Sequence, residues 1–157
     1  MSNRPYCSPP LRFGVWNPRS LKTKVSSLCD HLLSGSLDHL TMTESWLTSN
    51  DSITTADLTN SLENYAVYHL LRSTRRGGLA VIVRKGLHVL RNKGCILSSF
   101  KHFDLTITSG DKVYRLVTGY RPQPSKKKWL YSRKVFLGTL CVLRGVDCYI
   151  LSMPCLW

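Results

Sequence analysis

The chain is poor in acidic residues: 9 Asp and Glu stand against 22 Lys and Arg, which gives a formal net charge of +13. This shortage of carboxylates favours polyanionic partners, with nucleic acid first among them. The alternative is a solvated basic surface that binds nothing. With 157 residues, the chain has the length of one ordinary domain and is short for a two-sheet enzyme.

The six cysteines lack a pattern, since there is no CxxC pair and no Cys/His cluster with zinc-site spacing. The first ten residues lack the apolar core of a secretory signal. We therefore expect free thiols in a reducing compartment, the nucleus or the cytoplasm. Residues 135–157 are apolar, but Arg144 and Asp147 are costly in hydrocarbon, so a strand or an unstructured segment is expected there instead of a membrane span.

Apolar spacing near the N-terminus predicts a strand, a helix and a second strand. Residues 11–17 are typical of a strand, Pro18 ends it, and Ser20 is expected to cap the helix that follows. Residues 37–44 are typical of a buried strand. The helix between the strands is indicated by apolar residues at helical spacing: Leu21, Val25, Leu28 and Leu32.

The middle of the chain is expected to be mostly strands. Residues 48–60 are rich in Ser, Thr, Asn and Asp and predict a loop, with at most a short helical turn at 56–58. Gly110 supplies the positive φ that a hairpin turn often needs. Four further strands are expected, the last two as a hairpin: 65–71, 79–83, 103–108 and 113–120.

The composition changes abruptly after Pro124, where three lysines precede an apolar tail. We therefore expect a polar N-terminal segment over residues 1–10 and a folded domain over residues 11–125. A basic linker with an unrelated apolar tail is expected over residues 126–157.

Asn17 and Glu44 are the first candidate site residues, because each ends an apolar run and the two runs flank one helix. In an α/β layer, ligand-binding residues gather at the carboxyl ends of strands, so we expect the two side by side. Each also has an ordinary interpretation. A glutamate can simply begin a loop, and asparagine before proline is a common turn former.

Four blocks of the chain resemble, in order, motifs of the endonuclease domain of non-LTR (LINE-type) retrotransposons: Val15 to Leu21, Thr41 to Leu47, Arg75 to Val81 and Val117 to Pro122. That domain belongs to the endonuclease/exonuclease/phosphatase superfamily, with the apurinic endonucleases and DNase I. The likeness covers about residues 13 to 125.

The resemblance implies an α/β fold, the N-terminal half of a four-layer, DNase I-like α/β sandwich. A mainly antiparallel or mixed sheet with one flanking helix is expected. The chain would build about one of the two facing sheets, which leaves an apolar face exposed. Such a face favours self-association, or the missing half of the domain in a longer product as its partner.

The resemblance also implies hydrolysis of DNA phosphodiesters, by nicking, with Mg²⁺ or Mn²⁺ as cofactor. Glu44 matches the family's metal-binding glutamate, and Asn17 matches an asparagine that organises the metal site. Tyr120 matches the tyrosine that faces the scissile phosphate, although an aromatic residue at a strand end is commonly just packing. The residue types suit Mg²⁺, which prefers hard oxygen ligands and keeps several waters.

Basic residues near the expected site are candidates for contact with nucleic-acid phosphates. For Arg75 and Arg76 the alternative is a solvated turn. For the three lysines at 126–128 the alternative is a plain basic linker. The candidates are Arg75, Arg76, Arg121, Lys126, Lys127 and Lys128.

The residues with which the family completes its site are missing: an Asp-x-Asn strand end, another aspartate and a terminal histidine motif. No Asn follows Asn92, no His follows His102, and Asp147 is the only carboxylate after Asp111. The reaction needs a base or water-orienting carboxylate and a histidine-type stabiliser. We therefore expect a truncated endonuclease domain, inactive or weakly active alone. The alternatives are a non-catalytic module that binds nucleic acid and a degenerate fragment without function.

Overall fold

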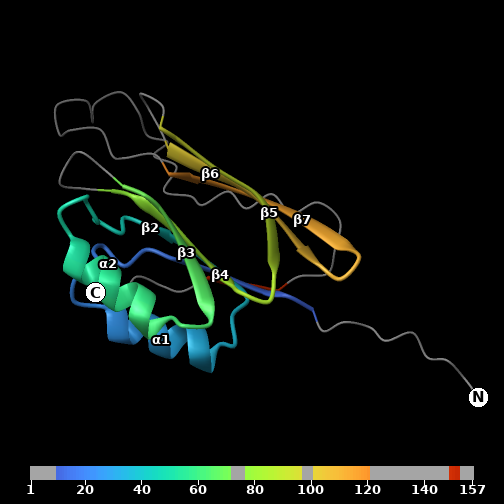
Figure 1. Cartoon of the computed structure of the whole chain (residues 1–157), viewed down its shortest axis with the longest axis horizontal. Helices are drawn as coiled ribbons and strands as arrows, with labels where there is room; N and C mark the ends of the chain where they lie inside the picture. The colour runs from blue at the N-terminus through green and yellow to red at the C-terminus, as the bar shows by residue number, and fades with distance from the viewer. Residues whose placement is uncertain (1–9, 72–76, 97–100, 121–148, 153–157) are drawn as a thin grey trace, which may run out of the picture.

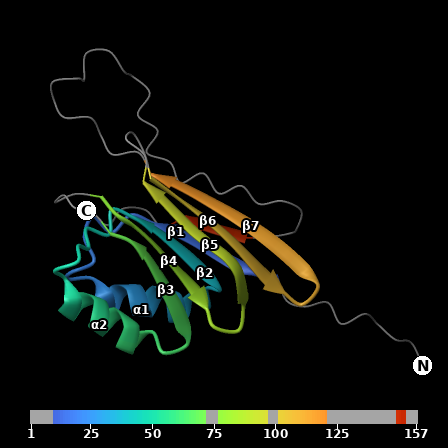
Figure 2. The ribbon, with the colours of Figure 1, turned by 45° about the horizontal axis from the view of Figure 1, so that its top comes forward.

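The computed structural model describes residues 10–71, 77–96, 101–120 and 149–152. They form two β-sheets and two helices in three layers (Figure 1). Both helices lie on one face of the larger sheet, and the smaller sheet lies on the other face (Figure 2). Neither of these two helices is long and apolar enough to cross a membrane.

The larger sheet has five strands in the order β3-β4-β2-β1-β8. β1 pairs in parallel with both β2 and β8, while β4 pairs antiparallel with both β2 and β3. Helix α1 (Val25–Ser34) makes the crossover between the parallel strands β1 and β2. The strands are β1 (Arg12–Trp16), β2 (His39–Thr43), β3 (Tyr65–Leu70), β4 (Leu79–Arg84) and β8 (Tyr149–Ser152).

The smaller sheet is an antiparallel meander in the order β5-β6-β7. Gly110 has a φ of 60° in the turn between β6 and β7, so the hairpin and the role of this glycine are as predicted. The strands are β5 (His88–Ile96), β6 (Lys101–Ser109) and β7 (Lys112–Tyr120).

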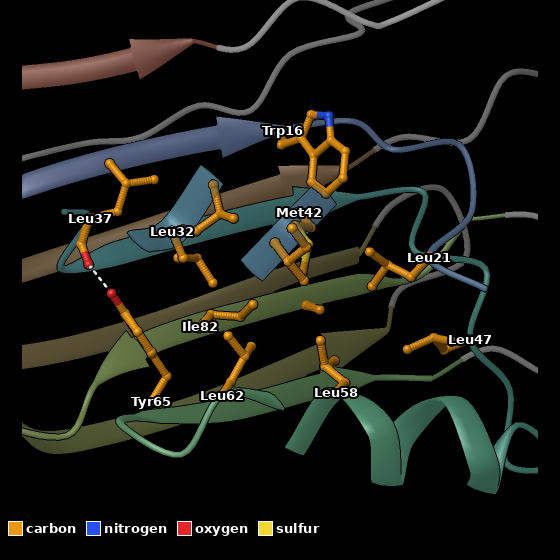
Figure 3. Packing of buried hydrophobic residues seen from close by; sticks show 13 residues of the cluster. Trp16, Leu21, Leu32, Leu37, Met42, Leu47, Leu58, Leu62, Tyr65 and Ile82 are labelled. Atoms are coloured by element: carbon orange, nitrogen blue, oxygen red, sulfur yellow. Dashed lines mark hydrogen bonds between the residues drawn. The ribbon is translucent and has the colours of Figure 1, made fainter. Parts of the chain in front are cut away.

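One hydrophobic core lies between the helices and the larger sheet (Figure 3). Leu28 and Leu32 of α1 and Leu58 of α2 (Ser52–Ser61) are fully buried in it. The Tyr65 hydroxyl donates a hydrogen bond of 2.9 Å to the Leu37 carbonyl, which satisfies the one polar atom that this tyrosine brings into the core. The helical spacing of leucines noted in the sequence therefore marks a buried face.

A second core fills the space between the two sheets, where alternate residues of β1 and β4 meet those of β6 and β7. Three polar side chains interrupt it. Thr41 Oγ1 lies 3.2 Å from Thr118 Oγ1 and 3.5 Å from His39 Nε2, and all three residues are buried. The hydroxyl pair is a direct polar link between the sheets.

The mixed α/β fold class is confirmed, but two expectations about its extent are wrong. The chain builds parts of two facing sheets, not about one, and the smaller sheet covers the apolar inner face of the larger. The apolar face that was expected to be exposed is therefore covered in the described residues, and self-association stays a prediction. β5 escaped prediction because nearly all its side chains are exposed, which leaves no apolar alternation to detect.

The second flanking helix, α2, was expected to be a loop with at most one helical turn. The hydroxyls of Thr55 and Thr59 donate to the carbonyls four residues earlier, at 3.0 and 2.9 Å, so these polar side chains are satisfied within the helix. Leu58 and Leu62 anchor it in the core. The sheet therefore has two flanking helices where the sequence predicted one.

Ser20 does not cap α1, which begins at Val25 with Lys24 before it. The Ser20 N–H instead donates to the Glu44 carbonyl. Cys29 and Cys95, the two cysteines in the described ranges, are free thiols as expected. Residues 149–152 form β8, which fits the expectation of a strand in the apolar tail; the boundary at residue 125 lies outside the described residues.

Candidate functional site

Asn17 and Glu44 directly follow the carboxyl ends of β1 and β2, two neighbouring parallel strands. Because Trp16 pairs with Met42, the chain leaves the sheet at nearly the same level in both strands. In α/β layers, ligand-binding residues gather beyond the carboxyl ends of parallel strands. The expected juxtaposition of the two residues is thus present in the backbone.

Backbone hydrogen bonds lock the two loops together. The N–H groups of Ser20 and Leu21 donate to the carbonyls of Glu44 and Ser45, each at 3.0 Å. Asn17 Oδ1 accepts the Arg19 N–H at 3.1 Å, so the asparagine side chain shapes its own loop. The position of Glu44 is therefore fixed by the loop that carries Asn17.

The backbone around Glu44 adopts conformations that are uncommon for residues with a side chain. Glu44 and Trp46 both have a φ of 55°, and Arg19 and Ser20 have values of 51° and 122°. Non-glycine residues with positive φ are uncommon, and such conformations cluster at ligand-binding and catalytic sites. Here they let both loops turn sharply and hydrogen-bond to each other.

A third segment, directly before β4, packs against the Glu44 loop. The Trp46 N–H donates to the Gly77 carbonyl at 2.8 Å. Gly78 has a φ of 98°, and a Cβ added there would lie 2.6 Å from Ser45 Oγ. The sequence carries no local signal that Gly78 packs against Ser45, which is buried.

Tyr120 ends β7, and two observations place this strand end at the same end of the sandwich as Glu44. Thr118, two residues earlier, meets Thr41 of β2. Tyr120 pairs with Lys101, whose Nζ donates to the Leu71 carbonyl just beyond β3, at 3.4 Å. β3 and β2 both run antiparallel to β4, so they end at one edge. The structure thus gathers the backbone of the three predicted site residues at one end.

An ion pair supports the same loops. Lys22 Nζ lies 2.6 Å from Asp51 Oδ1, which joins the loop after β1 to the start of α2. Thr48 donates to Asp51 Oδ2 through both its N–H and its hydroxyl, each at 2.9 Å. The hydrogen bond from Lys22, with those from Thr48, lowers the pKa of Asp51 to about 2. Asp51 is therefore ionised at neutral pH, and its contacts with Lys22 and Thr48 hold the loops after β1 and β2 together.

Asn17 and Glu44 suit a divalent cation by the chemistry of their donors. An amide and a carboxylate offer hard oxygens, and Mg²⁺ is usually held by one or two carboxylates with water and substrate phosphate completing its shell. In the described ranges no group of three His, Cys, Asp or Glu side chains could hold a metal ion by itself. The donor set fits Mg²⁺ bound with water and does not fit a closed structural site.

The remaining predicted site residues cannot be placed in this arrangement. The six basic candidates for phosphate contact lie outside the described residues: Arg75, Arg76, Arg121, Lys126, Lys127 and Lys128. Their roles stay predictions.

No family model and no curated protein matches the chain, but solved structures match its fold. Humanized D. rerio TDP2 with 14 mutations matches with a TM-score of 0.59 and 16% identity, over 74% of this chain and 49% of that one. D. rerio TDP2 complexed with single-strand DNA product matches with a TM-score of 0.58 and 16% identity, over 74% and 48%. The 3′ phosphatase NExo from Neisseria, bound to product DNA hairpin, gives 0.51 and 14%, over 68% and 39%.

The chain spans less than half the length of each of these proteins, and at these identities the likeness concerns the fold alone. The matched proteins belong to the endonuclease/exonuclease/phosphatase superfamily. The described part of the chain therefore has a partial DNase I-like fold.

Proposed function

We propose that this chain is part of a DNA-nicking endonuclease domain of the LINE-type retrotransposon kind, and that it supplies one half of the catalytic site. The observation that carries the proposal is the pairing of Asn17 and Glu44 at adjacent strand ends, with their loops joined by the hydrogen bond from Ser20 to Glu44. One of the two matched D. rerio TDP2 structures and the NExo structure hold DNA products, which supports DNA as the partner.

In this proposal Glu44 and Asn17 hold Mg²⁺ or Mn²⁺. The ion would supply charge stabilisation at a phosphoryl oxygen. Glu44 brings a negative charge to the site, while Asn17 keeps the Glu44 loop in place through the turn that it makes with Arg19. Tyr120 is proposed to face the scissile phosphate, since it ends β7 at the same end of the sandwich.

The chain alone is proposed to be inactive or weakly active. Asp147 is its only carboxylate after Asp111, so a positioned base and a histidine stabiliser would have to come from elsewhere, such as the other half of the domain in a longer product. A second candidate, a non-catalytic module that binds nucleic acid, is favoured by the net charge of +13. A degenerate fragment without function is the third alternative.

The metal site is tested by the change in thermal stability on adding Mg²⁺, because a ligand that binds the folded state raises its melting temperature. We expect a rise that Glu44→Gln abolishes. Glu63→Gln is the matched control, since it makes the same change at an exposed glutamate in the turn before β3. No rise in the unchanged chain, or an equal rise in Glu44→Gln, would refute the metal site.

Nicking of supercoiled plasmid then separates the two functional candidates. Mg²⁺-dependent nicking above that of Glu44→Gln shows that the chain has activity alone. DNA binding without nicking, with an affinity that falls steeply with salt, supports the binding module. If neither nicking nor salt-dependent binding occurs, the fragment without function is the remaining alternative.

A further inference from the structure

The smaller sheet presents one face to the core and the other away from it (Figure 2). On β6, Phe103, Leu105 and Ile107 pack into the core, so Asp104 and Thr106 between them lie on the outer face. We call this face, with its neighbours on β5 and β7, the outer face of the smaller sheet. Of the described elements, the helices lie on the far side of the larger sheet and do not cover it.

Two arginines contact one carboxylate on this face, and a lysine stands opposite that carboxylate on the neighbouring strand. Arg115 Nε and Nη2 donate to the two oxygens of Asp104 at 3.0 and 2.9 Å, and Arg91 Nη2 lies 3.4 Å from the same carboxylate. Lys93 is the register partner of Asp104 on β5 and is exposed. We call these four residues, Arg91, Lys93, Asp104 and Arg115, the arginine cluster.

The cluster carries more positive charge than its carboxylate can neutralise. Arg91 and Arg115 contact Asp104, and Lys93 adds a third positive charge on the same face. The hydrogen bond from Arg115 lowers the pKa of the Asp104 carboxyl, so it is ionised at neutral pH. The side chains of Arg91 and Arg115 are 51% and 59% exposed, and ion pairs so exposed to water contribute little to stability. Stabilisation of the fold therefore does not account for a second arginine and a lysine here.

The geometry suits a second acceptor on the open side. Asp104 occupies the Nε and Nη2 edge of Arg115, which leaves Nη1 for another oxygen. Arg91 and Lys93 stand two residues apart on one strand, about 6.6 to 6.8 Å, on the same face. Asp104 thus holds arginines in place on a flat, polar surface with a local excess of positive charge.

We propose that the outer face of the smaller sheet binds the phosphate backbone of DNA through Arg91, Lys93 and Arg115. The recognition is sequence-independent, since phosphates carry no base information. This surface lies in the middle of the smaller sheet, whereas Asn17 and Glu44 lie beyond strand ends of the larger one. It is therefore a second contact with DNA, independent of the metal site.

The test is the salt dependence of binding to a short labelled DNA duplex, measured by fluorescence anisotropy in EDTA so that no metal takes part. The binding constant falls with salt, and each lost phosphate contact makes the slope of log K against log salt less steep by about 0.9 for duplex DNA. We expect the double variant Arg91→Gln with Lys93→Gln to reduce the magnitude of this slope by about 1.8. Asp104 keeps its two hydrogen bonds from Arg115 in this variant, so the fold should be retained.

Arg12→Gln with Lys85→Gln is the matched control, because it removes two exposed cations of the larger sheet, on β1 and after β4. Its slope should stay near that of the unchanged chain. If the magnitude of the slope fell equally in both double variants, the effect would come from net charge alone and the proposal would be overturned. A slope that changed in neither variant would overturn it as well.

Two further measurements complete the test. Lys93→Gln alone, at an exposed position, should reduce the magnitude of the slope by about 0.9. This single variant tests the proposal even if the double variant does not fold. Polyglutamate that binds this face while the DNA duplex does not would assign it to an acidic protein partner and overturn the proposal. Loss of Mg²⁺ binding in Glu44→Gln leaves these expectations unchanged.

Discussion

Gly78→Ala should destabilise the fold and disturb the Glu44 loop. A residue with a side chain at a φ of 98° costs about 1 to 3 kcal/mol. The added Cβ would also lie 2.6 Å from Ser45 Oγ, so that this buried hydroxyl must move. We expect the free energy of unfolding to fall by about 2 to 3 kcal/mol.

Urea unfolding followed by circular dichroism measures this change from the shift of the midpoint. Combining Gly78→Ala with Ser45→Ala separates the two causes, because it removes the contacting hydroxyl and leaves the strained φ. We expect the double variant to recover part of the loss. The Mg²⁺-induced rise in melting temperature should also shrink in Gly78→Ala, since the Glu44 loop is displaced.

Gly86→Ala is the control for the same chemical change. A Cβ added at Gly86, in the turn after β4, would meet no heavy atom within 4 Å, and its φ is not positive. It should be neutral or stabilising by about 0.5 kcal/mol. If Gly78→Ala were as stable as Gly86→Ala, the close packing of Gly78 against Ser45 would be refuted.

Three other expectations concern pH and the polar link between the sheets. Burial lowers the pKa of His39 to about 3, so the unfolded chain binds the proton and stability falls as the pH drops from about 6.5 toward about 3. Burial also lowers the pKa of His69, so His39→Leu should weaken this dependence of the urea midpoints without removing it, and an unchanged dependence would contradict the reasoning. Asp51, with its pKa lowered to about 2, contributes stability above about pH 3.8 that is lost as the pH falls toward 2. The pKa of Asp104 is lowered as well, so Asp51→Asn should reduce the loss of stability in this pH range, and a loss of full size would speak against it. Thr118→Val keeps the shape but removes the hydroxyl that meets Thr41, so unfolding should become easier by about 1 kcal/mol, and a neutral result in urea would show that the hydroxyl pair does not hold the sheets.

Sequence patterns located the strand ends that carry Asn17 and Glu44 because a buried parallel strand is a short apolar run with a clear end. The same reasoning works for the hairpin of β6 and β7, whose alternation and turn glycine are local signals. These elements are set by residues close together in the chain, which makes them accessible from sequence.

Features that depend on distant residues were missed. α2 is helical because Leu58 and Leu62 pack into a core supplied by other elements, a tertiary effect that overrides its weak local preference. Ser20 has the residue type of a helix cap, but α1 begins only at Val25, and the Ser20 hydroxyl accepts the Lys22 N–H in the loop before the helix. The hydrogen bond from the Ser20 N–H to the Glu44 carbonyl, which holds this loop, comes from the next strand end. The close approach of Gly78 to Ser45 is likewise invisible until the strands are paired.

The pairing of β8 with β1 has a consequence for the order of folding. Arg12 pairs in parallel with Tyr149, so an edge of the larger sheet joins residues from opposite ends of the sequence. Such a contact closes a long loop and forms late, whereas β1, α1 and β2 can assemble from neighbouring residues. During synthesis the edge of β1 therefore stays open to pairing with other strands until residues 149–152 have left the ribosome.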